Sequence, residues 1–307
     1  MRKAILTVGA ACLLASVMAS SAVASPSTYQ HFEAKVFGKA GTAKKPGSVG
    51  SYLKPFHDLV LQPQCLPIAL NSTKPGCAGN EGTPGDAFTR GLGINGGALA
   101  ELPFATHRAR IYFPKELKLA TAGFPTCKSD VVLKTPTKCP KGSKIGAGVA
   151  NGFARGKSAC TGCYTLAPQL TVQVFVLSTK SIALRTYSSA TKEAIIEGVI
   201  SKYTGSDPKY GSIITFSLPK GLIEPIKGVM SQLAAFDSTI AAVKNKKGKP
   251  LQSLVGCPAN KQLTFGYNSD YNVKLDKVSS PKYVSSGEAF SINETGPIVT
   301  STVPCKK

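Results

Sequence analysis

The chain has 307 residues and a formal net charge of +21, from 37 basic and only 16 acidic residues. Hydrophobic residues make up 42% of it, which is enough to build a core and excludes a chain that is disordered throughout. Arginine is scarce among the basic residues, and the chain has no Trp. This composition argues against specific nucleic-acid recognition and against a sugar cleft walled by tryptophan.

The first 24 residues have the pattern of an export signal. Arg2 and Lys3 are followed by an apolar run over residues 4–18, and residues 22–24 (AVA) supply the small side chains that a signal peptidase recognises. The apolar run is shorter than the roughly 20 residues needed to span a bilayer. We therefore expect cleavage after Ala24, which lowers the net charge from +21 to +19, and no transmembrane segment afterwards.

Cysteine is the next informative residue type. Of the nine cysteines, cleavage would remove Cys12 and leave Cys65, Cys77, Cys127, Cys139, Cys160, Cys163, Cys257 and Cys305. An even number in an exported chain predicts disulfides. We expect neighbours to pair, as 65–77, 127–139, 160–163 and 257–305, although the spacing alone leaves other pairings open.

Alternation of apolar and polar residues, typical of strands with one buried face, dominates the chain. It occurs over residues 32–37, 108–113, 171–177, 181–187, 194–203, 212–218 and 262–267. Gly, Pro and Asn clusters separate these segments, and strands do not alternate with helices as they would in a doubly wound α/β fold. The sequence predicts an all-β protein, a disulfide-bonded antiparallel β-sandwich.

One segment follows a different period. Its apolar residues are spaced three and four apart, which favours one face of a helix, as in Ile226, Val229, Leu233, Phe236, Ile240 and Val243. Pro225 suits a first helical position, and Gly248 with Pro250 would end the helix. We predict one accessory amphipathic helix near residues 225–245, packed on the sandwich. A membrane-surface helix is the alternative, but its lysines gather at one end.

A short internal sequence similarity suggests that the chain has two related halves. Residues 112–117 (YFPKEL) and 217–222 (SLPKGL) each end a predicted strand, and each is followed by a Cys-Pro pair. We therefore divide the chain into a signal peptide over 1–24, an N-terminal β-rich half over 25–165, and a C-terminal β-rich half over 166–307 that contains the helical insertion.

The segment 124–127 (FPTC) followed by 139–148 (CPKGSKIGAG) resembles a pattern in uncharacterised secreted actinobacterial β-rich proteins, of the form Pro-x-Cys... Cys-Pro-x-x-Ser-x-Ile-Gly-x-Gly. Residues 40–46 (AGTAKKP) are similar to the same family, and the likeness covers roughly residues 32–155 well. The sequence departs from the pattern at Glu116, where the family has Gly. The resemblance implies secretion and a β fold, and it implies no activity.

Gly146 and Gly148 within that segment have a physical interpretation of their own. Glycines on either side of Ala147 favour a strand with a bulge or a close approach of another backbone. A phosphate-binding loop would need a helix to follow, and residues 149–153 have the pattern of a strand.

Candidate catalytic residues are few. Cys160 and Cys163 have the spacing of a redox pair, but a structural bridge in a loop between strands is favoured over a thiol oxidoreductase. The mature chain has only His31, His57 and His107, which form no metal-ligand spacing, so we expect no metal and no cofactor. A secreted hydrolase with an unrecognised site around His57, His107 or Cys160 is the alternative to a non-enzymatic protein.

The surplus of lysine is the most unusual bulk property. A strongly positive protein attracts polyanions, and in an exported protein these include anionic cell-wall polymers and glycans. The candidate binding residues form two clusters, which are Lys44 and Lys45 and then Lys244, Lys246, Lys247 and Lys249. The sequence predicts a secreted or cell-surface structural or binding protein of the envelope; a basic surface that only keeps the protein soluble is the alternative.

Overall fold

The computed structural model describes residues 30–57, 60–61, 99–101, 106–156, 165–166, 169–188, 192–225, 229–271 and 294–307. Its strands are β1 (Gln30–Phe37), β2 (Gly47–Ser48), β3 (Gly50–His57), β4 (Val60–Leu61), β5 (Leu99–Glu101), β6 (Thr106–Pro114), β7 (Leu117–Leu119), β8 (Lys144–Gly156), β9 (Thr165–Leu166), β10 (Leu170–Ser178), β11 (Ser181–Tyr187), β12 (Ala194–Lys202), β13 (Tyr210–Ser217), β14 (Val229–Ile240), β15 (Gln252–Leu254), β16 (Gln262–Tyr271), β17 (Glu294–Thr295) and β18 (Val299–Pro304). Helical turns among the described residues are α2 (Ser129–Lys134), the 3-10 helix η3 (Pro136–Lys138) and α3 (Lys220–Ile223).

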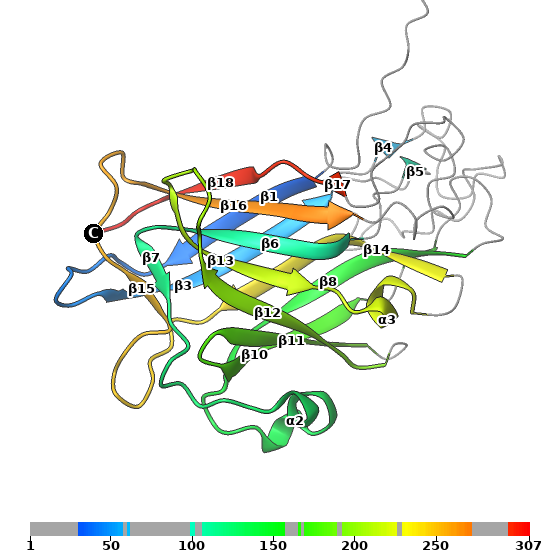
Figure 1. Ribbon diagram of the computed structural model, residues 1–307, viewed down its shortest axis with the longest axis horizontal. Helices are drawn as coiled ribbons and strands as arrows, with labels where there is room; N and C mark the ends of the chain where they lie inside the picture. Colours follow the sequence, from blue (N-terminus) through cyan, green and yellow to red (C-terminus); the bar gives the residue numbers. More distant parts are fainter. Residues whose placement is uncertain are drawn as a thin grey trace, which may run out of the picture.

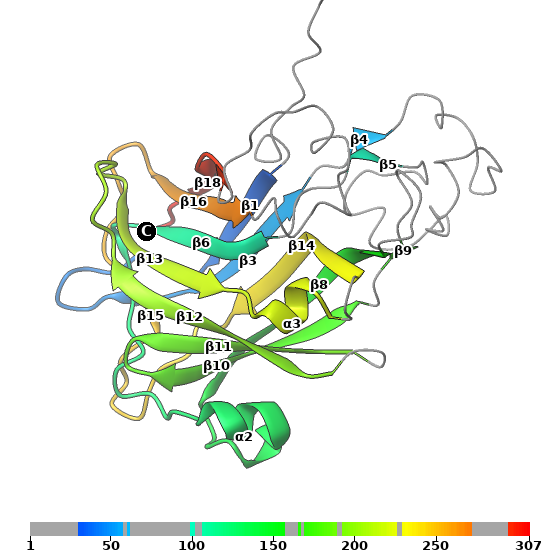
Figure 2. The same ribbon diagram turned by 45° about the vertical axis from the view of Figure 1, so that its right-hand side comes forward.

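Most of the strands belong to one 13-stranded antiparallel sheet. Its order is β1-β3-β14-β8-β10-β11-β12-β13-β6-β16-β17, with β9 paired to β8 and β18 paired to β16. The sheet curls until β18 lies beside β1, where the Ala34 N–H donates to Ser301 Oγ at 2.9 Å (Figures 1 and 2). The antiparallel β fold is confirmed, and strands that a sandwich would divide between two sheets belong here to one nearly closed sheet.

Strand alternation explains how this sheet builds its core. Val172, Val174 and Val176 of β10 are buried against the main apolar cluster inside the curled sheet. Phe175 lies between them in sequence and so points to the opposite face, where it packs with Val132 of α2. The short helix α2 thus covers part of the outer face of the sheet, beside β11 and β12 and against Phe175 of β10 (Figure 2).

The predicted strands are all confirmed, as β1, β6, β10, β11, β12, β13 and β16, with ends that differ by a few residues. The clearest agreement is β11, whose bounds, Ser181–Tyr187, match the predicted segment. Strands β1 and β12 show the expected alternation of inward and outward residues. Strand β11 is buried on both faces over most of its length, and Ala183 on its outer face lies in the cluster that contains Val132 of α2. The proposed relation between the two halves stays a prediction, and strands from both halves share the large sheet.

The predicted helix near residues 225–245 is wrong, because Val229–Ile240 is strand β14 in the middle of the sheet, between β3 and β8. Spacings of four in a strand are two alternations, so Phe236 and Ile240 share one face. The spacing of three from Leu233 to Phe236 spans a register irregularity in the pairing with β8, between Leu233 and Ala235. The irregularity in this long strand therefore produced the spacing of three and four that is typical of a helix.

The prediction for Gly146 and Gly148 is confirmed. A Cβ on Gly146 would lie 2.3 Å from the Thr239 backbone oxygen, and a Cβ on Gly148 would lie 1.8 Å from that of Asp237. Strand β8 therefore approaches β14 more closely than any side chain allows. The register between β8 and β10 also shifts beside these glycines, between Val174 and Phe175.

Two of the predicted disulfides are confirmed. Cys127–Cys139 encloses α2 and η3, and Cys257–Cys305 ties the C-terminal strand β18 to the segment after β15. Residues 65, 77, 160 and 163 lie outside the described part of the chain, so the pairs 65–77 and 160–163 stay predictions. Within the described ranges, no helix has both the length and the apolarity to span a membrane.

Candidate polyanion-binding surface

A second, small sheet at one end of the molecule positions the lysine clusters. It has the order β2-β15-β7, with Ser253 of β15 paired to Ser48 on one side and to Lys118 on the other. Val49 N–H donates to Gln252 O at 3.1 Å, and Val255 N–H donates to Glu116 O at 3.1 Å, which extends the pairing beyond the strands. Segments some 70 to 200 residues apart therefore meet at this end (Figure 1).

The first predicted cluster, Lys44 and Lys45, lies in the turn that leads into β2. Thr42 fixes the turn, because its N–H donates to Lys45 O at 3.0 Å and its Oγ1 accepts from Lys45 N–H at 3.1 Å. Gly41 anchors the turn to β15 by donating to Leu254 O at 3.0 Å. Both lysine side chains are exposed, so the turn presents two ammonium groups to solvent.

The second predicted cluster, Lys244, Lys246, Lys247 and Lys249, forms a tight turn after β14. The buried side chain of Asn245 organises it: Oδ1 accepts from the Lys247 and Lys249 N–H groups at 3.0 Å each. Nδ2 donates to Ala122 O at 3.4 Å, which fastens the turn to the segment after β7. The four lysine side chains are exposed around this buried amide.

Replacing Asn245 with alanine should lower the free energy of unfolding by about 1–3 kcal/mol, because two partly buried backbone N–H groups lose their acceptor. Urea unfolding measures the change. Lys246→Ala, in the same turn but exposed, serves as the control and should change stability by less than about 0.5 kcal/mol. Equal stability of the two variants would show that the amide does not organise the turn.

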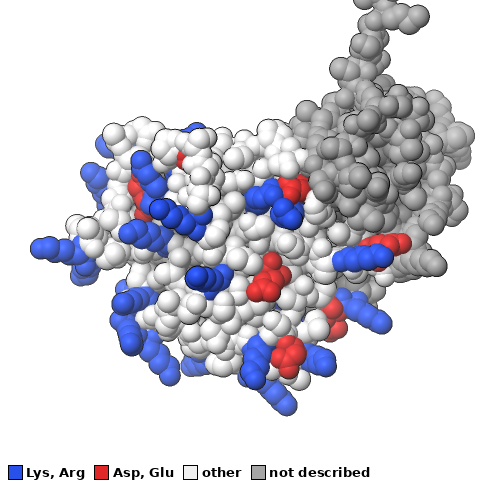
Figure 3. Space-filling model, in the orientation of Figure 1, with Lys and Arg blue, Asp and Glu red and all other residues white. Residues whose placement is uncertain are grey.

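Further lysines lie around the same small sheet. We define the lysine-rich end by its exposed lysines, which are Lys39, Lys44, Lys45, Lys115, Lys118, Lys244, Lys246, Lys247, Lys249, Lys261, Lys306 and Lys307. Backbone contacts join their segments: Ala40 N–H donates to Lys306 O at 2.7 Å, and Cys305 N–H donates to Lys261 O at 2.8 Å. Figure 3 shows basic side chains along this end with few acidic ones among them.

Ion pairs do not neutralise this end. Within the described residues, none of its lysines lies within salt-bridge distance of a carboxylate. Lys209, in the neighbouring turn between β12 and β13, pairs with Asp207 at 3.2 Å, and its backbone oxygen accepts from Lys115 N–H. The repelling ammonium groups therefore face solvent, where mobile counterions or a polyanion would balance them.

Arg108 and Arg110 are engaged in a partly buried ion pair with Asp270 and do not belong to the lysine-rich end. Arg110 binds Asp270 through both guanidinium nitrogens at 2.6 and 2.7 Å, and Arg108 approaches the same carboxylate at 3.4 Å. Burial alone would raise the pKa of Asp270, but hydrogen bonds from Arg110 and Thr295 and the two positive charges outweigh it and hold the pKa below its usual value. This group joins β6 to β16 and is a structural ion pair.

The residues of the alternative enzymatic hypothesis do not assemble a site in the described part of the chain. His107 lies on β6 beside Arg108, and its Nδ1 is buried without a hydrogen-bond partner there. Burial and the charges of Arg108 and Arg110 lower its pKa, against the opposing effect of Asp270. The His57 side chain, Cys160 and Cys163 lie outside what the structure describes, so the hydrolase and redox hypotheses stay untested.

The fold and this surface define a class: a disulfide-bonded, mainly antiparallel β protein whose solvated lysines gather at one end. Comparisons of the chain with protein-family models, with curated proteins and with solved structures find no match. The likeness to secreted actinobacterial proteins therefore stays a prediction. Among the described residues, no group of three His, Cys, Asp or Glu side chains could hold a metal ion.

Proposed function

We propose that this chain is a non-enzymatic, exported binding protein that attaches to anionic polymers of a cell envelope through its lysine-rich end. Two lysine clusters, some 200 residues apart in sequence, precede β2 and β15, which pair in one small sheet, and this convergence supports the proposal. Both clusters sit on turns fixed by hydrogen bonds, so the charges are presented without the entropy cost of ordering a loose loop.

The type of charge supports a polymer rather than a single defined anion. Lysine is a compact, hydrated point charge on a flexible stem, whereas specific carboxylate or phosphate sites favour the rigid fork of arginine. The lysine-rich end contains no arginine among its described residues. A repeating polyanion can contact many ammonium groups at once without a fixed geometry, and the net charge, which is +19 once residues 1–24 with Arg2 and Lys3 are removed, speeds its approach.

Export supports the envelope as the location. The signal-like residues 1–24 precede the β fold, and disulfides such as Cys127–Cys139 persist in oxidising compartments outside the cytosol. Cell-wall polymers and acidic glycans are the abundant polyanions in that setting.

The test compares two variants that remove equal charge from different places. One carries Lys244→Gln, Lys246→Gln, Lys247→Gln and Lys249→Gln. The control variant carries the same change at the exposed lysines around α2, namely Lys128, Lys134, Lys138 and Lys141. The first should bind long-chain polyphosphate and isolated cell walls about tenfold more weakly than the second at equal salt, since it loses four surface contacts of roughly 0.2–1 kcal/mol each.

Equal losses of affinity in the two variants would contradict the assignment, because they would show that total charge and not the lysine-rich end decides binding. Circular dichroism and thermal unfolding of both variants check that the fold is retained.

A further inference from the structure

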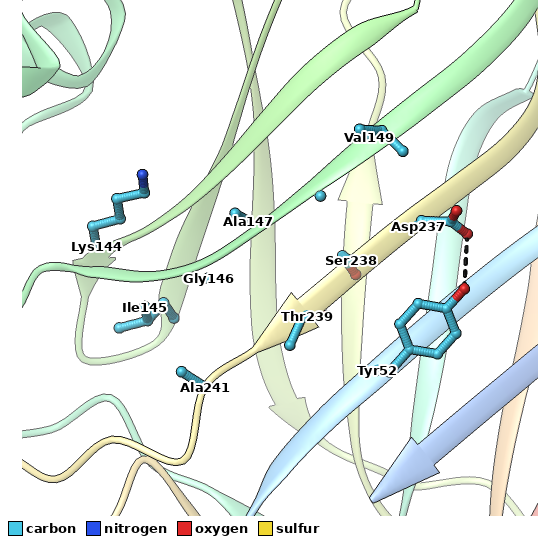
Figure 4. Close-up of a pocket in the computed structure, with 11 residues that line it drawn as sticks. Tyr52, Lys144, Ile145, Gly146, Ala147, Val149, Asp237, Ser238, Thr239 and Ala241 are labelled. Carbon is cyan, nitrogen blue, oxygen red and sulfur yellow. Dashed lines mark hydrogen bonds between the residues drawn. The ribbon is translucent and has the colours of Figure 1, made fainter. Parts of the chain in front are cut away.

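A shallow groove of about 600 Å³ runs along the outer face of the sheet over β3, β14 and β8. Tyr52, Asp237 and Thr239 point into it, while their sequence neighbours Leu53, Ser238 and Ile240 are buried on the other face. Figure 4 shows Tyr52, Asp237 and Thr239 and, across the groove, Lys144. The register pairs Thr239 with Tyr52 on one side and with Ala147 on the other.

Small residues of β8 make the hollow. In this part of β8 the methyl group of Ala147 lies between two glycines, Gly146 and Gly148, and Ala147 pairs with Thr239. Gly146 and Gly148 also line the groove, and they are the glycines that allow β8 to approach β14 closely. The groove therefore owes its form to the same residues that fix the centre of the sheet.

The polar groups of the groove form an ordered pair. Tyr52 Oη donates to Asp237 Oδ1 at 3.1 Å (Figure 4). Burial and the neighbouring Asp237 carboxylate raise the pKa of Tyr52, so the phenol keeps its proton and remains a donor. The carboxylate has further acceptor capacity, because two oxygens offer more lone pairs than one phenol can use.

Cations and aromatic rings border the groove on its β1–β3 side. Lys35 Nζ lies 5.3 Å from the centre of the Tyr52 ring, and Lys54 Nζ lies 5.5 Å from that of Phe56. His31 stacks on Phe56 with ring centroids 5.2 Å apart. Lys35 is paired with Glu33 at 2.8 Å, whereas Lys54 has no carboxylate within salt-bridge distance among the described residues. Lys54 is therefore the cation on this side that attracts anionic substituents.

The groove continues into the lysine-rich end. Ala241 lines the groove and donates its N–H to Ile145 O at 2.9 Å, and the turn with Lys244 begins three residues later. Lys144, at the start of β8, is exposed at the same mouth. A chain bound to the lysine turn could therefore extend along the groove without leaving the protein surface.

We infer that the groove binds an acidic polysaccharide, whose hydroxyl groups donate to Asp237 and bond Thr239 while its acidic groups contact Lys144 and the lysine-rich end. This inference rests on the proposed function and narrows its ligand. A polymer that carries only phosphates would be repelled by Asp237 and would offer that carboxylate no donor beyond Tyr52. A sugar polymer with acidic substituents satisfies the cations and the carboxylate together.

The test is the substitution Asp237→Asn, which keeps the acceptor for Tyr52 and removes one negative charge. Affinity for an oligogalacturonide should fall about tenfold, because a hydrogen bond to a charged group is lost. Charge attraction alone predicts the opposite sign, since the variant is more positive. Thr239→Val, which leaves the charge unchanged at an exposed strand position, should weaken the same binding. The control is Glu197→Gln, an equal charge change at an exposed position of β12.

Long-chain polyphosphate and poly-dT serve as the other probes, and Asp237→Asn should bind both as tightly as the parent or more tightly. If Asp237→Asn and Thr239→Val bind the oligogalacturonide as the parent does, or if poly-dT shows the same loss, the groove assignment is overturned while polyanion binding stands. If the parent binds none of the three polymers, the proposed function fails as well.

Discussion

Replacing Gly148 with alanine should lower the free energy of unfolding by about 3 kcal/mol or more, because the new methyl group has no space. Gly148 pairs with Ser238 of β14 and with Val172 of β10, so it lies at the centre of the large sheet. Its Cβ would lie 1.8 Å from the Asp237 backbone oxygen and 2.8 Å from the Ser238 Cα. Backbone atoms cannot move aside as a flexible side chain can, so the strands would have to separate.

Gly221→Ala is the matched control for that substitution. Gly221 lies in α3, where a Cβ would meet nothing within 4 Å, so alanine should be neutral or stabilise by up to about 1 kcal/mol. Equilibrium unfolding in guanidinium chloride measures both variants. If Gly148→Ala were as stable as Gly221→Ala, the close approach of β8 and β14 would be refuted.

Replacing Asp270 with asparagine should cost about 3–5 kcal/mol at neutral pH, since it leaves the Arg110 guanidinium partly buried without its counter-ion. The Asp270 side chain is only 6% exposed and also accepts from Thr295 Oγ1 at 2.9 Å. Asp207→Asn is the control, because it makes the same chemical change in an exposed pair and should leave stability nearly unchanged. Similar unfolding midpoints for the two variants would contradict the structural role of Asp270.

The cost of Asp270→Asn should depend on pH in a defined direction. The pKa of Asp270 is lower in the folded state than in the unfolded state, so its stabilising effect is fully present above the unfolded value of about 3.9. That effect is lost as pH falls through the folded pKa. When unfolding is measured from pH 7 to pH 3, the difference in the free energy of unfolding between parent and variant should stay constant and should become smaller only below about pH 4. If this difference grew on acidification, the pKa of Asp270 would not be lowered by folding and the assignment would be contradicted.

The strands with a clear inside and outside could be predicted from the sequence. In β10 the valines at 172, 174 and 176 alternate with Gln173 and Phe175, and this alternation is visible in the sequence because only the valine face meets the main apolar cluster. Strand β14 could not be predicted in the same way, because the irregularity between Leu233 and Ala235 breaks its alternation. Strand β3 contains Pro55, which lacks an N–H and is unusual between two neighbouring strands.

The two lysine clusters of the candidate surface could be predicted from the sequence, but their proximity could not. The clusters at Lys44 and Lys244 were apparent as local runs, but their meeting depends on β15 pairing with β2 and β7. These strands are two or three residues long, too short for any periodic signal. The groove was not visible at all, because Tyr52 and Asp237 are 185 residues apart and meet only through the pairing of β3 with β14.

The salt dependence of binding tests the lysine-rich end most directly. Each ammonium group that contacts a polyanion releases counterions, so the slope of log affinity against log salt concentration counts contacts, at roughly 0.7–0.9 per contact for nucleic-acid polymers. With long-chain polyphosphate, we expect the variant lacking the four lysines of the 244–249 turn to show a slope shallower by about two units or more than the variant changed around α2. Equal slopes for these two variants would contradict binding through this end.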